Sequence, residues 1–90
     1  MALKAVLYHT KNCPRCMVTN NQLKPYMQTQ QILIDRDQHF RMDIINYMDA
    51  NGFRSAPLVR IFDGDRQLDE WNGFQVKKIK HWQGYAKAHE

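Results

Sequence analysis

Two cysteines separated by two residues, Cys13 and Cys16, are the side chains in this sequence best suited to chemistry, and they are its only cysteines. A pair at this spacing indicates thiol–disulfide exchange, half of a metal site, or coincidence. A purely structural bridge across so short a loop would stabilise the fold little, because the gain grows with loop length. Redox chemistry is therefore the leading interpretation of the pair.

A zinc site is the second interpretation, but the sequence holds few further ligands for it. A structural zinc ion takes four cysteine or histidine ligands. The histidines are widely spaced and form no close pair: His9, His39, His81 and His89. We therefore expect no metal within one chain. A non-catalytic binding module, in which two chains share a four-sulfur site, stays open as an alternative.

The residues around the cysteine pair favour a reactive thiolate at Cys13. Pro14 suits the first position of a helix, so Cys13 would be the N-cap and would face free N–H groups and the positive end of the helix dipole. Lys11 and Arg15 add positive charge nearby, although exposed charges are screened. Such surroundings lower a cysteine pKa from about 8.5 to roughly 3.5–7.5. Cys13 would attack a partner disulfide, and Cys16 would resolve the mixed disulfide.

Strands and helices alternate along the chain around this pair. The expected elements are a strand at 3–8, a helix at 14–24, a strand at 32–34, a helix bearing the apolar residues 40, 44, 45 and 48, strands at 58–62 and 66–71, and a helix over 76–86. Pro25 should end or kink the first helix near Lys24 because proline breaks the hydrogen-bond pattern. Asp37 is the expected cap of the second helix, Asn51-Gly52 its end, and Asp63-Gly64 a hairpin turn.

Helical periodicity also predicts which residues reach the core. These are Met17, Val18 and Leu23 on the first helix, Phe40, Ile44, Ile45 and Met48 on the second, and Val76, Ile79, Trp82 and Ala86 on the last.

The order β-α-β-α-β-β-α predicts an α/β fold. Its alternating start indicates parallel strands with right-handed crossovers, and its closing hairpin adds an antiparallel edge. We expect a four-stranded mixed sheet with helices on both faces, which is the thioredoxin-type arrangement, in one domain over residues 1–90. The cysteine pair would then lie where the first strand ends and the first helix begins.

Composition and charge exclude several classes of protein. The chain has 90 residues, of which 43% are hydrophobic and 24% charged, as in ordinary globular domains. Its formal net charge of +4 suits acidic partners but is small for a polybasic nucleic-acid binder, so we expect no nucleic acid. No apolar run is long enough to span a membrane. Lys4 interrupts the apolar amino terminus, which is interpreted as a strand and not a signal; we expect a cytoplasmic monomer.

Three blocks of the sequence carry a family resemblance. They are Tyr8 with Cys13-Pro14-Arg15-Cys16, then Gly52-Phe53-Arg54-Ser55-Ala56-Pro57-Leu58, and finally Trp71-Asn72-Gly73-Phe74. The first resembles the active-site entry of glutaredoxins, and the other two resemble the NrdH-type redoxins, which are glutaredoxin-like members of the thioredoxin superfamily. The sequence departs from that pattern at Thr10, where many members carry a lysine; here the lysine is Lys11.

The resemblance implies a thiol–disulfide oxidoreductase that acts as a small dithiol electron carrier. Such a carrier is reduced by thioredoxin reductase and passes electrons to ribonucleotide reductase and other protein disulfides. It holds no cofactor besides its redox-active disulfide, here Cys13–Cys16. The implied roles are attack by Cys13 and resolution by Cys16.

The resemblance also implies a partner-binding surface. Pro57 would be the family's cis-proline beside the disulfide, and Ala56 would offer backbone hydrogen bonds to an extended partner segment. Trp71, Gly73 and Phe74 would contribute to the partner-facing surface, with core packing as the alternative role of the two aromatic side chains.

A glutathione-dependent glutaredoxin is the nearest alternative function. Glutathione-binding glutaredoxins usually carry Gly-Gly followed by acidic residues after the last strand. Here that place reads Asn72-Gly73-Phe74-Gln75-Val76-Lys77-Lys78, without the acidic pair. The resemblance therefore favours direct reduction by a flavoprotein reductase.

Overall fold

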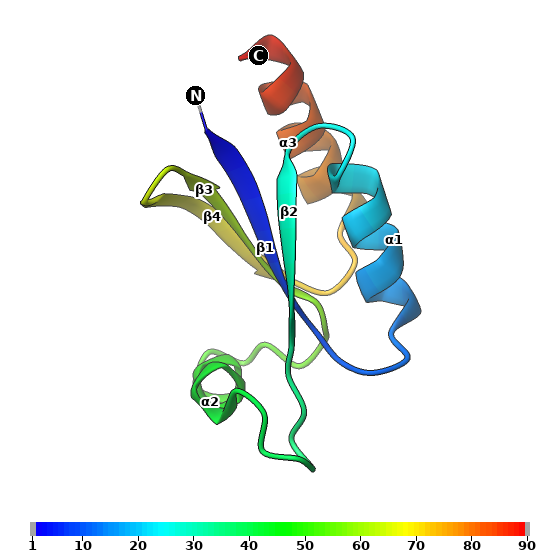
Figure 1. The fold of residues 1–90 in the computed structure, drawn as a ribbon, viewed down its shortest axis with the longest axis vertical. Helices are drawn as coiled ribbons and strands as arrows, with labels where there is room; N and C mark the ends of the chain where they lie inside the picture. The colour runs from blue at the N-terminus through cyan, green and yellow to red at the C-terminus, as the bar shows by residue number, and fades with distance from the viewer. Residues whose placement is uncertain (1, 90) are drawn as a thin grey trace.

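A four-stranded sheet and three helices make up residues 2–89, the part of the chain that the computed structural model describes (Figure 1). The elements are β1 (Leu3–His9), α1 (Pro14–Leu23), β2 (Gln28–Leu33), α2 (Met42–Ala50), β3 (Leu58–Asp63), β4 (Arg66–Asn72) and α3 (Val76–Ala88). The strand order is β2-β1-β3-β4. β1 pairs in parallel with β2, whereas the β1–β3 and β3–β4 pairs are antiparallel. The predicted element order and mixed sheet are confirmed.

The sheet has a separate hydrophobic core on each face. Helices α1 and α3 cover one face and α2 covers the other (Figure 1). Because successive strand residues point to opposite faces, Ala5 and Leu7 of β1 pack in the α1/α3 core while Val6 and Tyr8 pack in the α2 core. β1 is thus buried on both sides, and it carries the cysteine loop at its carboxyl end, away from the chain termini (Figure 1).

Two predicted core residues of α1 are exposed. Met17 is 63% exposed and Val18 is 40% exposed, so their assignment to the core was wrong. The helix buries Cys16, Thr19, Asn20 and Leu23 instead. These residues follow the i, i+3, i+4, i+7 spacing of one helical face, so α1 buries the face that begins at Cys16.

The last predicted helix shows a similar difference at its start. Val76 is 44% exposed, whereas Ile79, Trp82 and Ala86 are buried as expected. Val76 is the first residue of α3, and the buried face of the helix begins at Ile79.

The start of α2 also differs from the prediction. The Asp35 carboxylate accepts bonds from the Asp37 and Gln38 N–H groups at 3.0 and 3.2 Å and so holds a turn before the helix. α2 begins only at Met42, and Phe40 is 51% exposed, so Asp37 is not its cap and Phe40 is not a core residue. An aspartate that bonds backbone groups two and three residues ahead competes with helix formation.

β2 is longer than its apolar run suggested. It begins at Gln28, and its first four residues are polar. As an edge strand it pairs only with β1, and its residues up to Gln31 are largely exposed. Residues 2–89 form no helix with the length and apolarity needed to cross a bilayer.

Asp69 of β4 links the sheet to α3 through hydrogen bonds. Its carboxylate accepts bonds from Lys78 Nζ at 2.9 and 3.0 Å and from Trp82 Nε1 at 2.9 Å. Partial burial by itself would raise the pKa of Asp69, but the bonds from Lys78, Trp82 and the Glu70 N–H outweigh it and hold the pKa below the ordinary value of an aspartate. The carboxylate is therefore charged at neutral pH.

The Asp69→Asn variant is expected to lower the free energy of unfolding by about 1–2 kcal/mol at neutral pH, because it loses a charge-assisted bond to Lys78. The pKa of Asp69 is lower in the folded chain than in the unfolded chain. Its carboxylate therefore stabilises the fold at pH values above the unfolded-state pKa, and this stabilisation is lost as the pH falls through the folded-state pKa. Urea unfolding at neutral pH and at progressively lower pH checks this. An equal difference between wild type and variant at every pH would contradict it.

Candidate active site

Cys13 caps the amino terminus of α1, as predicted. Its backbone is extended (φ −111°, ψ 96°), Pro14 follows at the first helical position, and its sulfur accepts a bond from the Cys16 N–H at 3.2 Å. The helix dipole and this donor both point at the sulfur, an arrangement that stabilises a thiolate when the pair is reduced.

The two cysteines form a disulfide with their Cα atoms 5.3 Å apart. Cys13 is half-buried, whereas Cys16 is only 2% exposed. A partner molecule can therefore reach the sulfur of Cys13, while that of Cys16 is covered by protein. This difference suits Cys13 to attack a partner and Cys16 to react only with Cys13.

The two positive charges predicted to lower the pKa of Cys13 are those of Lys11 and Arg15, and only Lys11 has an ion-pair partner within residues 2–89. The Lys11 ammonium lies 3.2 Å from the Asp35 carboxylate. The pKa of Asp35 is lowered chiefly by the bond from the Gln38 N–H, against which burial acts, and Lys11 lowers it further. Arg15 has no ion-pair partner within residues 2–89.

The loop before β3 lies beside the disulfide. The Ala56–Pro57 peptide bond is cis, and Pro57 is fully buried. The Pro57 carbonyl accepts a bond from the Gly73 N–H at 2.8 Å, which ties this loop to the one after β4. Within the described chain, neither the N–H nor the C=O of Ala56 has a hydrogen-bond partner. Those two groups are free to pair with an extended segment of another molecule.

A groove of about 490 Å³ joins the cysteine loop to the loop before β3. It is lined by Thr10, Asn12, Cys13, Pro14, Arg15, Arg54, Ser55 and Ala56. Four of the predicted site residues thus meet in one groove, and the buried Pro57 follows Ala56 in the chain. Asn12 has a left-handed backbone (φ 52°) where the loop turns into the cap.

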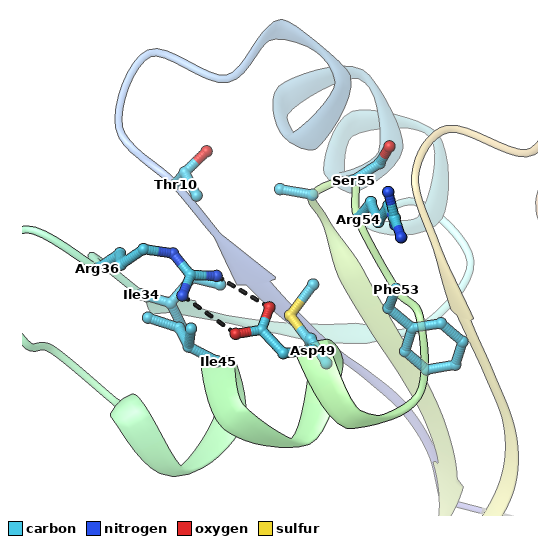
Figure 2. Close-up of a pocket in the computed structure, with 10 residues that line it drawn as sticks. Thr10, Ile34, Arg36, Ile45, Asp49, Phe53, Arg54 and Ser55 are labelled. Carbon is cyan, nitrogen blue, oxygen red and sulfur yellow. Dashed lines mark hydrogen bonds and ion pairs between the residues drawn. The ribbon is translucent and has the colours of Figure 1, made fainter.

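A smaller hollow of about 150 Å³ continues the groove toward α2 (Figure 2). Thr10, Arg54, Ser55 and Ala56 line both spaces. Figure 2 shows the floor of the hollow on α2, where Asp49 is paired with Arg36, and the Arg54–Ser55 loop on the other side. The surface beside Cys13 therefore extends over the Ala56 backbone to α2.

Comparison with solved structures identifies the architecture. The chain is similar to the glutaredoxin-like protein NrdH-redoxin from Escherichia coli, with 24% identity, a TM-score of 0.64, and 87% of this chain and 92% of that chain covered. The chain has the thioredoxin fold. Thioredoxin f2 from Chlamydomonas reinhardtii is also similar, with 11% identity, a TM-score of 0.60, and coverage of 93% of this chain and 78% of that one.

A third similar structure is a complex of ferredoxin:thioredoxin reductase with thioredoxin f2, which matches at 14% identity and a TM-score of 0.60, covering 96% of this chain and 78% of that chain. No family model and no curated protein sequence matches the chain. The comparisons therefore establish the thioredoxin fold and not a particular activity.

The predicted residues after β4 occupy different environments in this thioredoxin fold. Trp71 is 3% exposed and packs in the α1/α3 core. Gly73 is buried beside Ser55, and Phe74 is 39% exposed. The indole of Trp71 is thus a core side chain, and Phe74 is the aromatic residue of the block that a partner can touch.

Sequence reasoning missed Arg54 and Ser55 as residues of the site. Both lie in the Gly52–Leu58 block, and both line the groove beside Cys13. Their place three and two residues before Pro57 was the available signal, since that loop has to pass the disulfide if Pro57 does. Among residues 2–89, no group of three or more histidine, cysteine or acidic side chains is placed to hold a metal ion.

Gly73 permits the close approach of two site loops, and the Gly73→Ala variant tests this role. Gly73 has φ +78°, and an added Cβ would lie 3.3 Å from Ser55 Cβ. Gly52 (φ +71°) has nothing within 4 Å, so Gly52→Ala is the matched control for the backbone cost of about 1–2 kcal/mol. Urea unfolding should show the larger loss for Gly73→Ala, and that variant alone should also slow disulfide turnover. Equal effects of the two variants would contradict this role.

Proposed function

We propose that this protein is a thiol–disulfide oxidoreductase that carries two electrons on Cys13 and Cys16. The observation that supports this most is the reachable Cys13 sulfur at a helix N-cap, bonded to a buried second sulfur. The unpaired backbone of Ala56 in the same groove adds a place for the partner chain.

The reaction has two exchange steps. The thiolate of reduced Cys13 attacks one sulfur of a partner disulfide; a bond forms between them, and the other partner sulfur leaves with the electron pair. Cys16, deprotonated, then attacks Cys13, forms the Cys13–Cys16 disulfide and releases the second partner sulfur. The partner gains two electrons and two protons, and the protein loses them. A reductase returns the protein to the dithiol by the reverse exchange.

Thioredoxin reductase is the proposed source of electrons, and ribonucleotide reductase and other protein disulfides are the proposed acceptors. The similarity to a redoxin described as having a thioredoxin-like activity profile supports this choice. The similarity to a thioredoxin seen in complex with ferredoxin:thioredoxin reductase supports only direct reduction by a reductase protein, not the flavoprotein in particular. The absence of an acidic pair after Gly73 supports it further. This cycle fits a reducing compartment, for which the cytoplasm is our proposal.

Reduction of the oxidised protein by NADPH with thioredoxin reductase, side by side with reduction by glutathione, tests the proposed reductant. Insulin reduction coupled to NADPH consumption reports turnover. We expect rapid reduction by the flavoprotein and slow reduction by glutathione. The reverse order would assign the chain to glutathione-dependent glutaredoxins, and no turnover with either reductant would overturn the proposed oxidoreductase.

A further inference from the structure

Two arginines beside the reactive sulfur have no carboxylate partner. Arg15 and Arg54 both line the groove with Cys13, and neither has an ion pair within residues 2–89. Two neighbouring cations do have carboxylate partners. The Lys11 ammonium nitrogen lies 3.2 Å from an Asp35 carboxylate oxygen, and a guanidinium nitrogen of Arg36 lies 2.9 Å from an Asp49 carboxylate oxygen. Figure 2 shows the contrast between the paired Arg36 and the unpaired Arg54.

The groove itself contains no negative charge to balance these arginines. The described residues that line it include no aspartate or glutamate. Asp35 and Asp49, on the adjoining surface, are already bonded to Lys11 and Arg36. The surface that receives the partner's sulfur is therefore positive, and such a surface attracts and orients segments of opposite charge.

The form of the surface fits an extended chain. The free N–H and C=O of Ala56 can pair with a strand-like backbone. Arg54 precedes Ala56 by two residues and lines both the groove and the hollow over α2. A segment paired at Ala56 would pass Arg54 and then reach that hollow, whose floor includes Ile45 and Met48. A segment on this path would be longer than a tripeptide bound at Cys13 alone.

We infer that the preferred substrate is an extended protein segment that carries acidic side chains next to the disulfide cysteine, selected by Arg54 together with Arg15. This inference rests on the proposed oxidoreductase function and adds the chemistry of its substrate. Arg54 positions the segment through its carboxylates, and Cys13 and Cys16 carry out the exchange.

A set of peptide disulfides of equal length tests the inference. Each peptide carries glutamate, glutamine or lysine on both sides of the cysteine, and kcat/KM is measured for the full chain at low and high salt. The wild-type protein should prefer the glutamate peptide over the lysine peptide by about tenfold at low salt, and by less at high salt because the charges are screened.

Two variants of equal charge change separate the groove from the rest of the surface. Arg54→Glu should lower kcat/KM for the glutamate peptide by about tenfold and raise it for the lysine peptide. Lys87→Glu is the control, since Lys87 is exposed at the end of α3 remote from the cysteine loop (Figure 1). It should leave the preference unchanged. Matching urea unfolding curves would show that both variants are folded.

Several results would overturn the inference. One is an equal rate for the three wild-type peptides, and another is an equal effect of Arg54→Glu on all of them; both would leave the oxidoreductase function standing. Faster turnover of glutathione disulfide than of the glutamate peptide, with the same dependence on Arg54, would assign the arginines to glutathione. Failure to reduce any disulfide would overturn the proposed function and this inference together.

Discussion

The Cys13→Ser variant is expected to reduce disulfide turnover to the uncatalysed background, a loss of at least about a thousandfold. The serine hydroxyl cannot form a disulfide, so the first exchange step has no nucleophile. Cys16 cannot replace it, because its side chain is only 2% exposed. NADPH-coupled insulin reduction measures the loss, and substantial residual turnover would contradict the assignment of Cys13.

Cys16→Ser is the matched control for Cys13→Ser, since it makes the same chemical change one helical turn away. It should keep the first attack and lose the second, so that a mixed disulfide with one partner per chain accumulates. Intact-mass measurement after mixing with a peptide disulfide detects this adduct. Its formation on the Cys13→Ser variant instead would show that the two cysteines have exchanged roles.

The geometry of the cysteine site could be predicted because it depends on local residues. Pro14 permits a helix to start directly after Cys13, and this fixes the cap irrespective of the rest of the fold. The turn residues Gly52 and Gly64 likewise mark real chain reversals, and both have positive φ. These three features, each encoded within a few residues, were predicted correctly.

Most errors concern features that depend on tertiary contacts; the wrong cap at Asp37 is a local exception, because the Asp35 carboxylate holds a turn there instead. Whether Met17 or Thr19 of α1 faces the sheet is decided by how the helix docks, and Thr19 is fully buried while Met17 is exposed. The polar residues of β2 form a strand because β1 supplies its hydrogen bonds. Arg54 belongs to the site only because the loop before β3 returns beside Cys13. None of these follows from hydrophobic periodicity.

The roles of the two aromatic residues after β4 can be separated by truncating each one. Trp71→Ala should lower the free energy of unfolding by about 3–5 kcal/mol, because it empties a site in the α1/α3 core where the indole is 3% exposed. Phe74→Ala should cost less than about 1 kcal/mol, since Phe74 is 39% exposed.

Disulfide turnover should depend more on Phe74 than on Trp71, which is the reverse of their order for stability. Phe74→Ala should slow reduction of protein disulfides while the chain stays folded, as expected for a side chain that touches the partner. Trp71→Phe keeps an aromatic ring in the core and removes an indole N–H that has no hydrogen-bond partner within residues 2–89, so it should retain most of both stability and turnover. Urea unfolding and insulin reduction on the same samples measure the two effects. A stable Trp71→Ala variant with impaired partner reduction would instead place Trp71 at the partner surface, and with it the whole loop that Gly73 fastens to Pro57.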